Sequence, residues 1–220
     1  MIKICSVVVG DTLEEFLKNL DMVQEVSNFV ELRVDYIENF SIDYLDIIRK
    51  NTIKESIFTC RSVAEGGKFS GNKKSLAEII KRANELKFDH VDVELSMLDE
   101  VDFSEKFSKI IGSYHNFRET PSYDELVNIY DTIKKHKIVD IVKIATNVVN
   151  DDDNIELVKL LISKTKENII AIGMGDKGKI TRIISPLLGG YLTFASVKKN
   201  ISASGQFSLE ELNKIYNLCV

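Results

Sequence analysis

A lysine stands in the middle of a stretch that has the composition of a buried β-strand. The stretch is "DIVKIAT", residues 140–146, and the lysine is Lys143. Burying an ammonium group costs on the order of several kcal/mol unless the group is paired or loses its proton. An apolar setting disfavours the charged form and so lowers the pKa of a lysine. Because a neutral amine attacks ketones and aldehydes, Lys143 suggests Schiff-base chemistry.

Schiff-base chemistry also needs a proton carrier. A protonated imine withdraws electrons and acidifies the neighbouring carbon, so a base that works near neutral pH can remove a proton there. His115, near the end of another strand-like run, is a residue of this type. Glu65, just after a third run, is expected to orient His115. Three arginines are suited to an anionic or hydroxylated substrate: Arg33, Arg61 and Arg182.

Alternating strands and helices must position these residues. Eight strand-like runs follow one another, at residues 2–9, 29–35, 56–61, 90–95, 109–116, 140–146, 168–174 and 191–196. The segments between them carry apolar residues at spacings of three and four, as amphipathic helices do. Eight such units predict one (β/α)8 TIM barrel domain over residues 1–220, with a helix after each strand and the site at the carboxyl ends of the strands. Because periodicity does not show closure, a doubly wound open sheet remains the alternative.

Charged side chains gather on single faces of the predicted strands. Side chains alternate across a strand, so Glu31, Arg33 and Asp35 share one face, and Lys143 points into the barrel because its apolar neighbours point outward. A neutralised ion cluster is the simpler interpretation. However, barrel interiors are normally filled by Val, Ile and Leu, and buried ion clusters rarely stabilise more than apolar packing does. The polar interior therefore indicates a site.

Asp92 and Glu94, with His90 behind them, form a possible metal-binding face. Three ligands at every second position of one strand enclose an ion poorly, and no second histidine cluster is present in the sequence. The two carboxylates are instead expected to pair with the interior cations, and no metal is predicted.

The segment "GMGDKG", residues 173–178, matches the pattern G-x-G-x-x-G. It follows the seventh strand instead of the first, and no acidic residue ends the next strand to bind a ribose. Turn glycines are therefore favoured over a dinucleotide site.

Composition narrows the class of protein. The chain has 220 residues, 44% of them hydrophobic and 29% charged, with a net charge of −5. These values indicate a globular protein and argue against nucleic acid as a partner. The sequence contains no apolar run of membrane-spanning length and no secretory leader pattern. Three widely spaced cysteines, Cys5, Cys60 and Cys219, fit a reducing cytoplasm, so a cytoplasmic location without disulfides is expected.

Seven short segments in order give a more specific result. They are "ELRVD" (31–35), "TCRSVAEGG" (59–67), "DVEL" (92–95), "SYHNF" (113–117), "VKIA" (142–145), "ITRI" (180–183) and "SASGQ" (202–206). Together with the lysine and the histidine, they make the chain resemble the type I 3-dehydroquinate dehydratases over essentially its whole length. Each segment alone is weak, and the ordered set is specific.

The resemblance implies a TIM barrel, a homodimer, and a lyase that needs no metal or cofactor. It implies syn dehydration of 3-dehydroquinate to 3-dehydroshikimate in the shikimate pathway, which leads to the aromatic amino acids. Lys143 would form the imine, His115 would carry protons and Glu65 would orient His115. The implied substrate-binding residues are Ser6, Glu31, Arg33, Arg61, Arg182, Ser202 and Gln206.

The chain departs from the family pattern in the loop before the last helix. The family often has a proline before the glycine of this loop, whereas this chain has Ser204 before Gly205. The choice between Ser202 and Ser204 as the substrate ligand therefore stays open. The small, polar segment "KKNISASGQ" (198–206) is expected to act as a lid that closes through Gln206.

Two rival functions remain at this point. A class I aldolase acting on a sugar phosphate would also use a barrel lysine, and "GMGDKG" could then bind the phosphate. The other rival is a non-catalytic barrel that binds a metabolite, against which the combination of Lys143, His115 and Glu65 argues.

Overall fold

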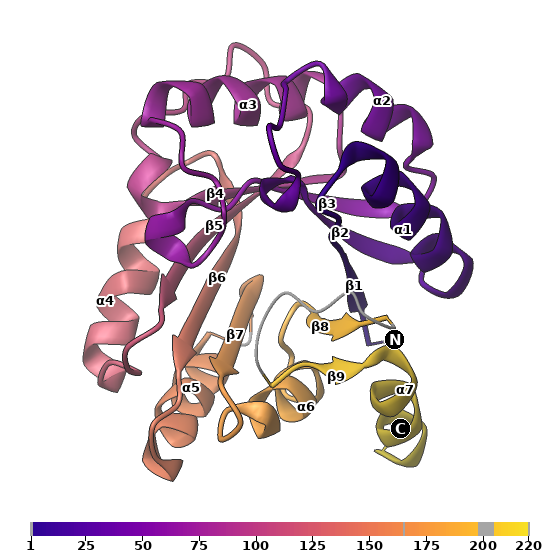
Figure 1. The fold of residues 1–220 in the computed structure, drawn as a ribbon. Helices are drawn as coiled ribbons and strands as arrows, with labels where there is room; N and C mark the ends of the chain where they lie inside the picture. Colours follow the sequence, from indigo (N-terminus) through magenta and orange to yellow (C-terminus); the bar gives the residue numbers. More distant parts are fainter. Residues whose placement is uncertain (1, 165, 198–204, 220) are drawn as a thin grey trace.

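A single curled sheet surrounded by helices forms the molecule (Figure 1). The computed structural model describes residues 2–164, 166–197 and 205–219. Its nine strands pair in the order β7-β6-β5-β4-β3-β2-β1-β8-β9, and every pair is parallel. The strands are β1 (Ile4–Val8), β2 (Phe29–Arg33), β3 (Glu55–Thr59), β4 (His90–Glu94), β5 (Lys109–Asn116), β6 (Val139–Asn147), β7 (Ile169–Met174), β8 (Thr193–Ser196) and β9 (Phe207–Ser208).

The strand order confirms the barrel and rules out the doubly wound sheet. Consecutive strands are neighbours from β1 to β7, and β8 returns to pair with β1 through Cys5 and Phe194. A doubly wound sheet would instead reverse its strand order near the middle. Within the described chain no ladder joins β7 to β8, but the backbone N–H of Tyr191 donates to the carbonyl of Ile169 at 2.7 Å across this seam.

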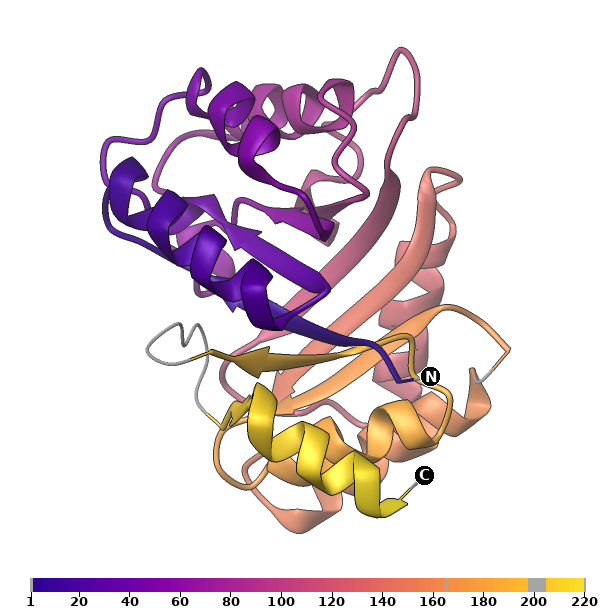
Figure 2. The same cartoon turned by 90° about the vertical axis from the view of Figure 1, so that its right-hand side faces the viewer.

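Helices cover the outer face of the sheet (Figure 2). They are α1 (Leu13–Val26), α2 (Tyr44–Asn51), α3 (Lys73–Glu85), α4 (Tyr123–Lys134), α5 (Asp151–Ser163), α6 (Lys179–Leu187) and α7 (Leu209–Cys219). Among the described residues, none of these helices is both long enough and apolar enough to span a membrane.

The expectation of a helix after every strand is wrong at one position. Between β4 and β5 the chain forms only the 3-10 turn η3 (Leu95–Met97) and an irregular segment. Met97, Leu98 and Val101 are buried in this segment and cover the sheet where a helix would lie. Although they are three and four residues apart, they span only five residues, and no longer apolar periodicity extends them into a helix.

Side-chain alternation separates two apolar regions. On β6, Val142 and Ile144 pack outward against the helices, whereas Ile141 and Ala145 belong to the apolar cluster inside the barrel. Lys143 has the same parity as this second pair, so the predicted inward direction of its side chain is confirmed. Apolar side chains fill the lower interior, and the charged residues gather above them at the carboxyl ends of the strands.

Candidate active site

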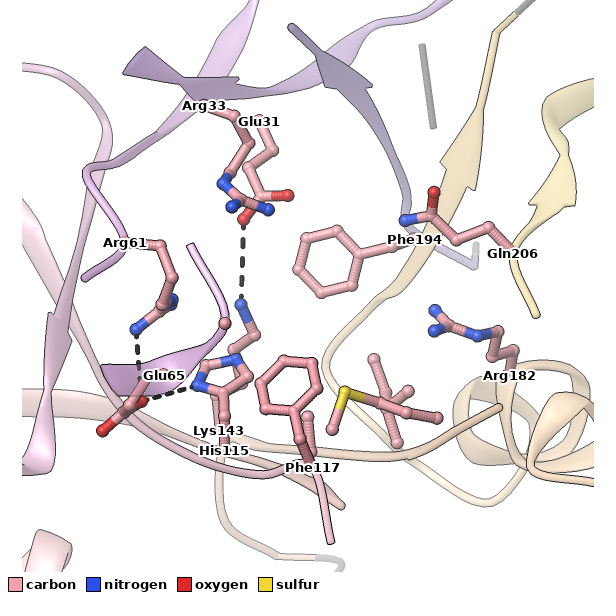
Figure 3. A pocket seen from close by; sticks show the side chains of 14 residues that line it. Glu31, Arg33, Arg61, Glu65, His115, Phe117, Lys143, Arg182, Phe194 and Gln206 are labelled. Atoms are coloured by element: carbon pink, nitrogen blue, oxygen red, sulfur yellow. Dashed lines mark hydrogen bonds and ion pairs between the residues drawn. The ribbon is translucent and has the colours of Figure 1, made fainter. Parts of the chain in front are cut away.

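A pocket opens at the carboxyl ends of the barrel strands (Figure 3). Eight of the ten predicted site residues line it: Glu31, Arg33, Arg61, Glu65, His115, Lys143, Arg182 and Gln206. Ser202 lies outside the described residues, as do Ser204 and most of the expected lid.

The structure does not bring Ser6 to the pocket. Ser6 alternates with Cys5 and Val7, which belong to the interior cluster, so its side chain faces the outer layer together with Val8. Its hydroxyl is fully buried and has no hydrogen-bond partner in the described chain.

Lys143 lies near the floor of the pocket, between two carboxylates. Its Nζ donates a hydrogen bond to Asp92 Oδ2 at 3.1 Å and lies 3.7 Å from Glu31 Oε1. The same nitrogen is 4.8 Å from the centre of the Phe194 ring, a cation–π distance. The apolar setting expected around Lys143 is therefore incomplete, because strands β2 and β4 supply counter-charges.

Asp92 joins two interior cations. Its Oδ1 accepts hydrogen bonds from Arg61 at 2.7 Å and from Ser113 at 2.6 Å, while its Oδ2 faces Lys143. Burial alone would raise the pKa of Asp92, but Arg61 and Lys143 outweigh that effect and hold it well below the usual range. The carboxylate thus acts as a charge partner, as its strand position predicts.

The pairing of Glu94 and the position of His90 explain why this strand makes a poor metal site. Glu94 lies 3.4 Å from Arg61 and accepts hydrogen bonds from the backbone N–H and the hydroxyl of Ser62. His90 lies at the opposite end of β4, where its ring contacts Tyr191 and the carbonyl of Ser56. In the described parts of the chain, no three His, Cys, Asp or Glu side chains are grouped closely enough to hold an ion.

His115 and Glu65 form a hydrogen-bonded pair at the side of the pocket. His115 Nδ1 lies 2.8 Å from Glu65 Oε2, and Arg61 approaches the same oxygen at 3.5 Å. Burial raises the pKa of Glu65 to about 8 although Arg61 opposes this effect. Burial also lowers the pKa of His115 well below its ordinary value, and the positive charges of Arg61 and Lys143 act in the same direction. A dry environment therefore disfavours charge on both partners.

The pair lies close to Lys143 because of the register of two neighbouring strands. Ser113 on β5 is paired with Lys143 on β6, and His115 is paired with Ala145. His115 is therefore one inward-facing position nearer to the pocket mouth than Lys143 is. A substrate atom bonded to Lys143 Nζ would have the imidazole on one side of it.

Arg182 supplies a buried positive charge on the far side of the pocket (Figure 3). It lies on α6 and is 2% exposed, and its Nε has no hydrogen-bond partner among the described residues. Burial lowers the pKa of Arg182 to about 10, with Glu31 partly compensating. Figure 3 places the amide of Gln206 next to this guanidinium. A buried cation that forms no ion pair with any described residue suits an anionic ligand group.

Arg33 differs from Arg182 because it already has a partner. Its Nε and Nη2 both donate to the carboxylate of Asp35 at 2.8 Å, and its guanidinium lies 4.9 Å from the Tyr36 ring centre. This bidentate pair fixes the guanidinium at the pocket edge.

Glycines bring two distant segments together behind Gln206. Gly205 has φ +76°, and a Cβ there would lie 2.4 Å from the carbonyl oxygen of Gly175, which itself has φ +78°. Gly175 belongs to "GMGDKG", so these glycines serve the turn before α6, as expected.

Sequence reasoning missed the apolar walls of the pocket. They consist of Phe117, Ala145, Ile172, Met174 and Phe194, together with the backbone of Gly66. Strand parity could have found several of them, since Ala145 is two residues beyond Lys143, and Ile172 and Met174 alternate along β7.

Comparisons with known proteins point to one family. A model of the type I 3-dehydroquinase family matches residues 4–219. A 3-dehydroquinate dehydratase from Coxiella burnetii is 44% identical over 215 residues, covering 97% of this chain and 92% of that protein. A 3-dehydroquinate dehydratase from Methanocaldococcus jannaschii is 37% identical over 221 residues, covering 98% of each chain. The solved type I 3-dehydroquinate dehydratase from Clostridium difficile has a TM-score of 0.89 at 30% identity, covering 99% of this chain and 92% of that one.

These matches span nearly the full chain at identities that exceed what fold similarity alone produces. The chain belongs to the type I 3-dehydroquinase family.

Proposed function

We propose that Lys143, His115 and Glu65 carry out the reaction of this family in this chain. That reaction is the dehydration of 3-dehydroquinate to 3-dehydroshikimate through a lysine Schiff base, a step of the shikimate pathway. The observation that carries the proposal is the position of Lys143 Nζ, which is buried in the same pocket that the Glu65–His115 pair lines. Family membership decides against the aldolase alternative.

Catalysis begins when Lys143 loses a proton and its neutral Nζ attacks the C3 ketone. The resulting carbinolamine takes up a proton on its hydroxyl group and loses water, which leaves an iminium with the same single positive charge that the ammonium had. Asp92 and Glu31 face a cation both before this step, as the ammonium, and after it, as the iminium, so their carboxylates are compensated in both states. This arrangement stabilises the iminium without moving any protein charge.

His115 next removes a proton from C2. The electron pair of the C–H bond moves toward the iminium nitrogen and forms an enamine. The enamine then expels the C1 hydroxyl, which takes a proton from the imidazolium and leaves as water. Hydrolysis of the remaining imine releases the product and restores Lys143. The hydrogen bond from Nδ1 to Glu65 keeps Nε2 of His115 directed toward the substrate during both proton transfers.

Substrate binding is assigned to the cations and polar groups at the pocket rim. Arg182 binds the substrate carboxylate, because it is buried and no described residue pairs with its charge. Gln206 contacts the same end of the substrate, while the hydroxyl groups are bound by Glu31, Arg33 and Arg61.

Covalent capture tests this assignment. Borohydride added with substrate should reduce the imine, abolish activity, and add the mass of the reduced ligand to the peptide that contains Lys143. Lys143→Met should acquire no label, whereas Lys159→Met, which changes a lysine on the outside of α5, should be labelled like the wild type. Label on any lysine other than Lys143, or full activity after treatment, would refute the proposal. Appearance of the conjugated enone product in absorbance measures turnover independently.

We also propose that the chain acts as a homodimer in the cytoplasm. Large apolar side chains are exposed on α5 and α6, at Ile155, Ile162, Ile180 and Leu187, and they offer a surface for a second copy. The cysteines Cys5, Cys60 and Cys219 are unpaired, which suits a reducing compartment. Light scattering would give twice the chain mass if the dimer forms, and Ile162→Glu should lower it.

A further inference from the structure

Phe117 lies over the catalytic pair and has no role in the chemistry described so far. It follows the last residue of β5 and lines the pocket. Its ring stacks on that of His115, with 6.5 Å between the ring centres and 20° between the planes (Figure 3). Its side chain is 51% exposed, so the other side of the ring meets solvent.

The tip of the same ring reaches the loop after β3, at the residue that follows Glu65. A Cβ on Gly66 would lie 2.2 Å from Phe117 Cζ, closer than real atoms approach. Gly66 also has φ +75°, a conformation that L side chains rarely adopt. The absence of a side chain at position 66 therefore lets the ring extend from His115 to the neighbour of Glu65.

We propose that Phe117 is a positioning residue that covers the Glu65–His115 hydrogen bond and excludes water from it, with Gly66 providing the space. The inference rests on the proposed function, in which this pair moves protons. It explains why a large apolar ring remains half exposed at the pocket mouth, where burial would otherwise be favourable. It also explains how a pair so near the surface remains dry.

The charges around the pair do not depend on Phe117. Arg61 faces it from the end of β3, Asp92 and Glu94 from β4, Lys143 from β6 and Arg33 from β2. Burial is the largest contribution to the perturbed titration of both Glu65 and His115. Removing the ring leaves all of these charges in place and admits water, so both groups should titrate closer to their ordinary values.

The chain offers a direct readout, because it contains only three histidines. Protein labelled with ¹⁵N at histidine is titrated by NMR, and the signals are assigned with His115→Gln and His136→Gln. In the wild type the His115 ring should stay neutral well below pH 6.5. In Phe117→Ala its titration should move upward toward that ordinary value of about 6.5, while the signals of His90 and His136 stay unchanged.

Phe107→Ala is the matched control. Phe107 is also a half-exposed phenylalanine, 43% exposed, and it precedes β5 where Phe117 follows it. Its ring lies near Lys87, at the opposite end of the strand from the pocket. Phe107→Ala should leave both the His115 titration and turnover unchanged.

Gly66→Ala tests the same contact from the other side. The added methyl group should displace the ring and move the His115 titration in the same direction, although Phe117 is still present. If the two residues act through one contact, Phe117→Ala should add little to Gly66→Ala, so their effects should not be additive. Phe117→Leu, which keeps an apolar but shorter side chain, should give an intermediate shift and guards against a folding defect.

Steady-state kinetics complete the test. The positioning role predicts a fall in kcat of about tenfold for Phe117→Ala, a fraction of the total contribution of a general base, with KM changed less than about threefold. A raised KM with unchanged kcat and an unchanged titration would show that the ring is only a wall for the substrate, and would overturn the inference. An unchanged His115 titration in the folded variants would overturn it too. The NMR result needs no turnover, so absence of activity in the wild type would refute the proposed function separately.

Discussion

Arg182 should reduce the stability of the free protein while serving substrate binding. Its guanidinium is 2% exposed, and no described residue forms an ion pair with it. Arg182→Met keeps much of the length of the side chain and removes the charge. We therefore expect this variant to be more stable than the wild type and to bind substrate poorly.

The size of the gain follows from the titration of the group. Burial lowers the pKa of Arg182 from its ordinary value of 12.5 to about 10. Since each tenfold change in a protonation equilibrium corresponds to about 1.4 kcal/mol, the charged form is disfavoured in the fold by roughly 3 kcal/mol. Because methionine fills the space imperfectly, a gain of about 1–3 kcal/mol is expected, which raises Tm by roughly 3–10 °C for a chain of this length.

The pH dependence of this gain has a definite sign. The folded pKa lies below the unfolded one, so the unfolded chain holds this proton more tightly and the penalty is present at every pH below about 10. It is relieved only as the pH rises through that value. The difference in unfolding free energy between Arg182→Met and the wild type should therefore be constant between about pH 6 and pH 9.

Urea unfolding and steady-state kinetics on one preparation measure both effects. Loss of a charge-assisted contact to a substrate carboxylate costs about 2 kcal/mol or more, so kcat/KM should fall at least about thirtyfold. Arg33→Met is the matched control, because Arg33 is also buried but is paired bidentately with Asp35. Leaving that carboxylate unpaired should destabilise the fold by about 3–5 kcal/mol, the opposite sign.

Two results would refute this reasoning. A less stable Arg182→Met would mean that Arg182 has a partner in the free protein that balances its charge. A stabilised variant with unchanged kcat/KM would mean that Arg182 does not bind the substrate carboxylate, and the anionic end of the substrate would have to be placed elsewhere in the pocket.

Three further predictions concern the charged interior. His115→Ala should stall after imine formation, so intact-protein mass spectrometry without a reductant should find an adduct on Lys143; near-normal turnover would remove His115 from the mechanism. Because of the Glu65–His115 pair, kcat/KM should rise with pH through an apparent pKa near 8. Glu65→Gln should move this rise to lower pH. If the rise does not move, it belongs to another group. Asp92→Asn should lower the unfolding free energy by about 3 kcal/mol near neutral pH. Denaturation at several pH values should show the full loss above about pH 4. The loss should become smaller only in stronger acid, because the folded pKa of Asp92 is depressed.

The sequence predicts the fold well where periodicity carries the information. Apolar alternation in "DIVKIAT" places Lys143 inside the barrel, and the structure agrees. The segment between β4 and β5 is different, because its helix was inferred from the regularity of the other units. Met97, Leu98 and Val101 cover the sheet there without forming an α-helix, and only three-dimensional packing shows that they suffice.

The site could be predicted as a set of residues but not as a network. The sequence brings His115 and Glu65 together by strand order, yet it cannot show that Asp92 connects Arg61 to Lys143. Contacts between side chains from three different strands depend on register and rotamers, which no local pattern encodes. Ser6 shows the opposite case. The family resemblance implies that Ser6 binds the substrate, but its position on β1 directs its side chain away from the pocket.

The contact between Gly175 and Gly205 has a consequence for how this sequence can diverge. The carbonyl of Gly175 leaves no room for a side chain at position 205, and both residues need left-handed backbone. A side chain at either position would therefore disturb the backbone next to Gln206, although the two glycines are separated by the whole of α6 and β8 and neither lines the pocket. The substitutions that "GMGDKG" can accept are therefore limited by Gly205, a residue that comes much later in the sequence.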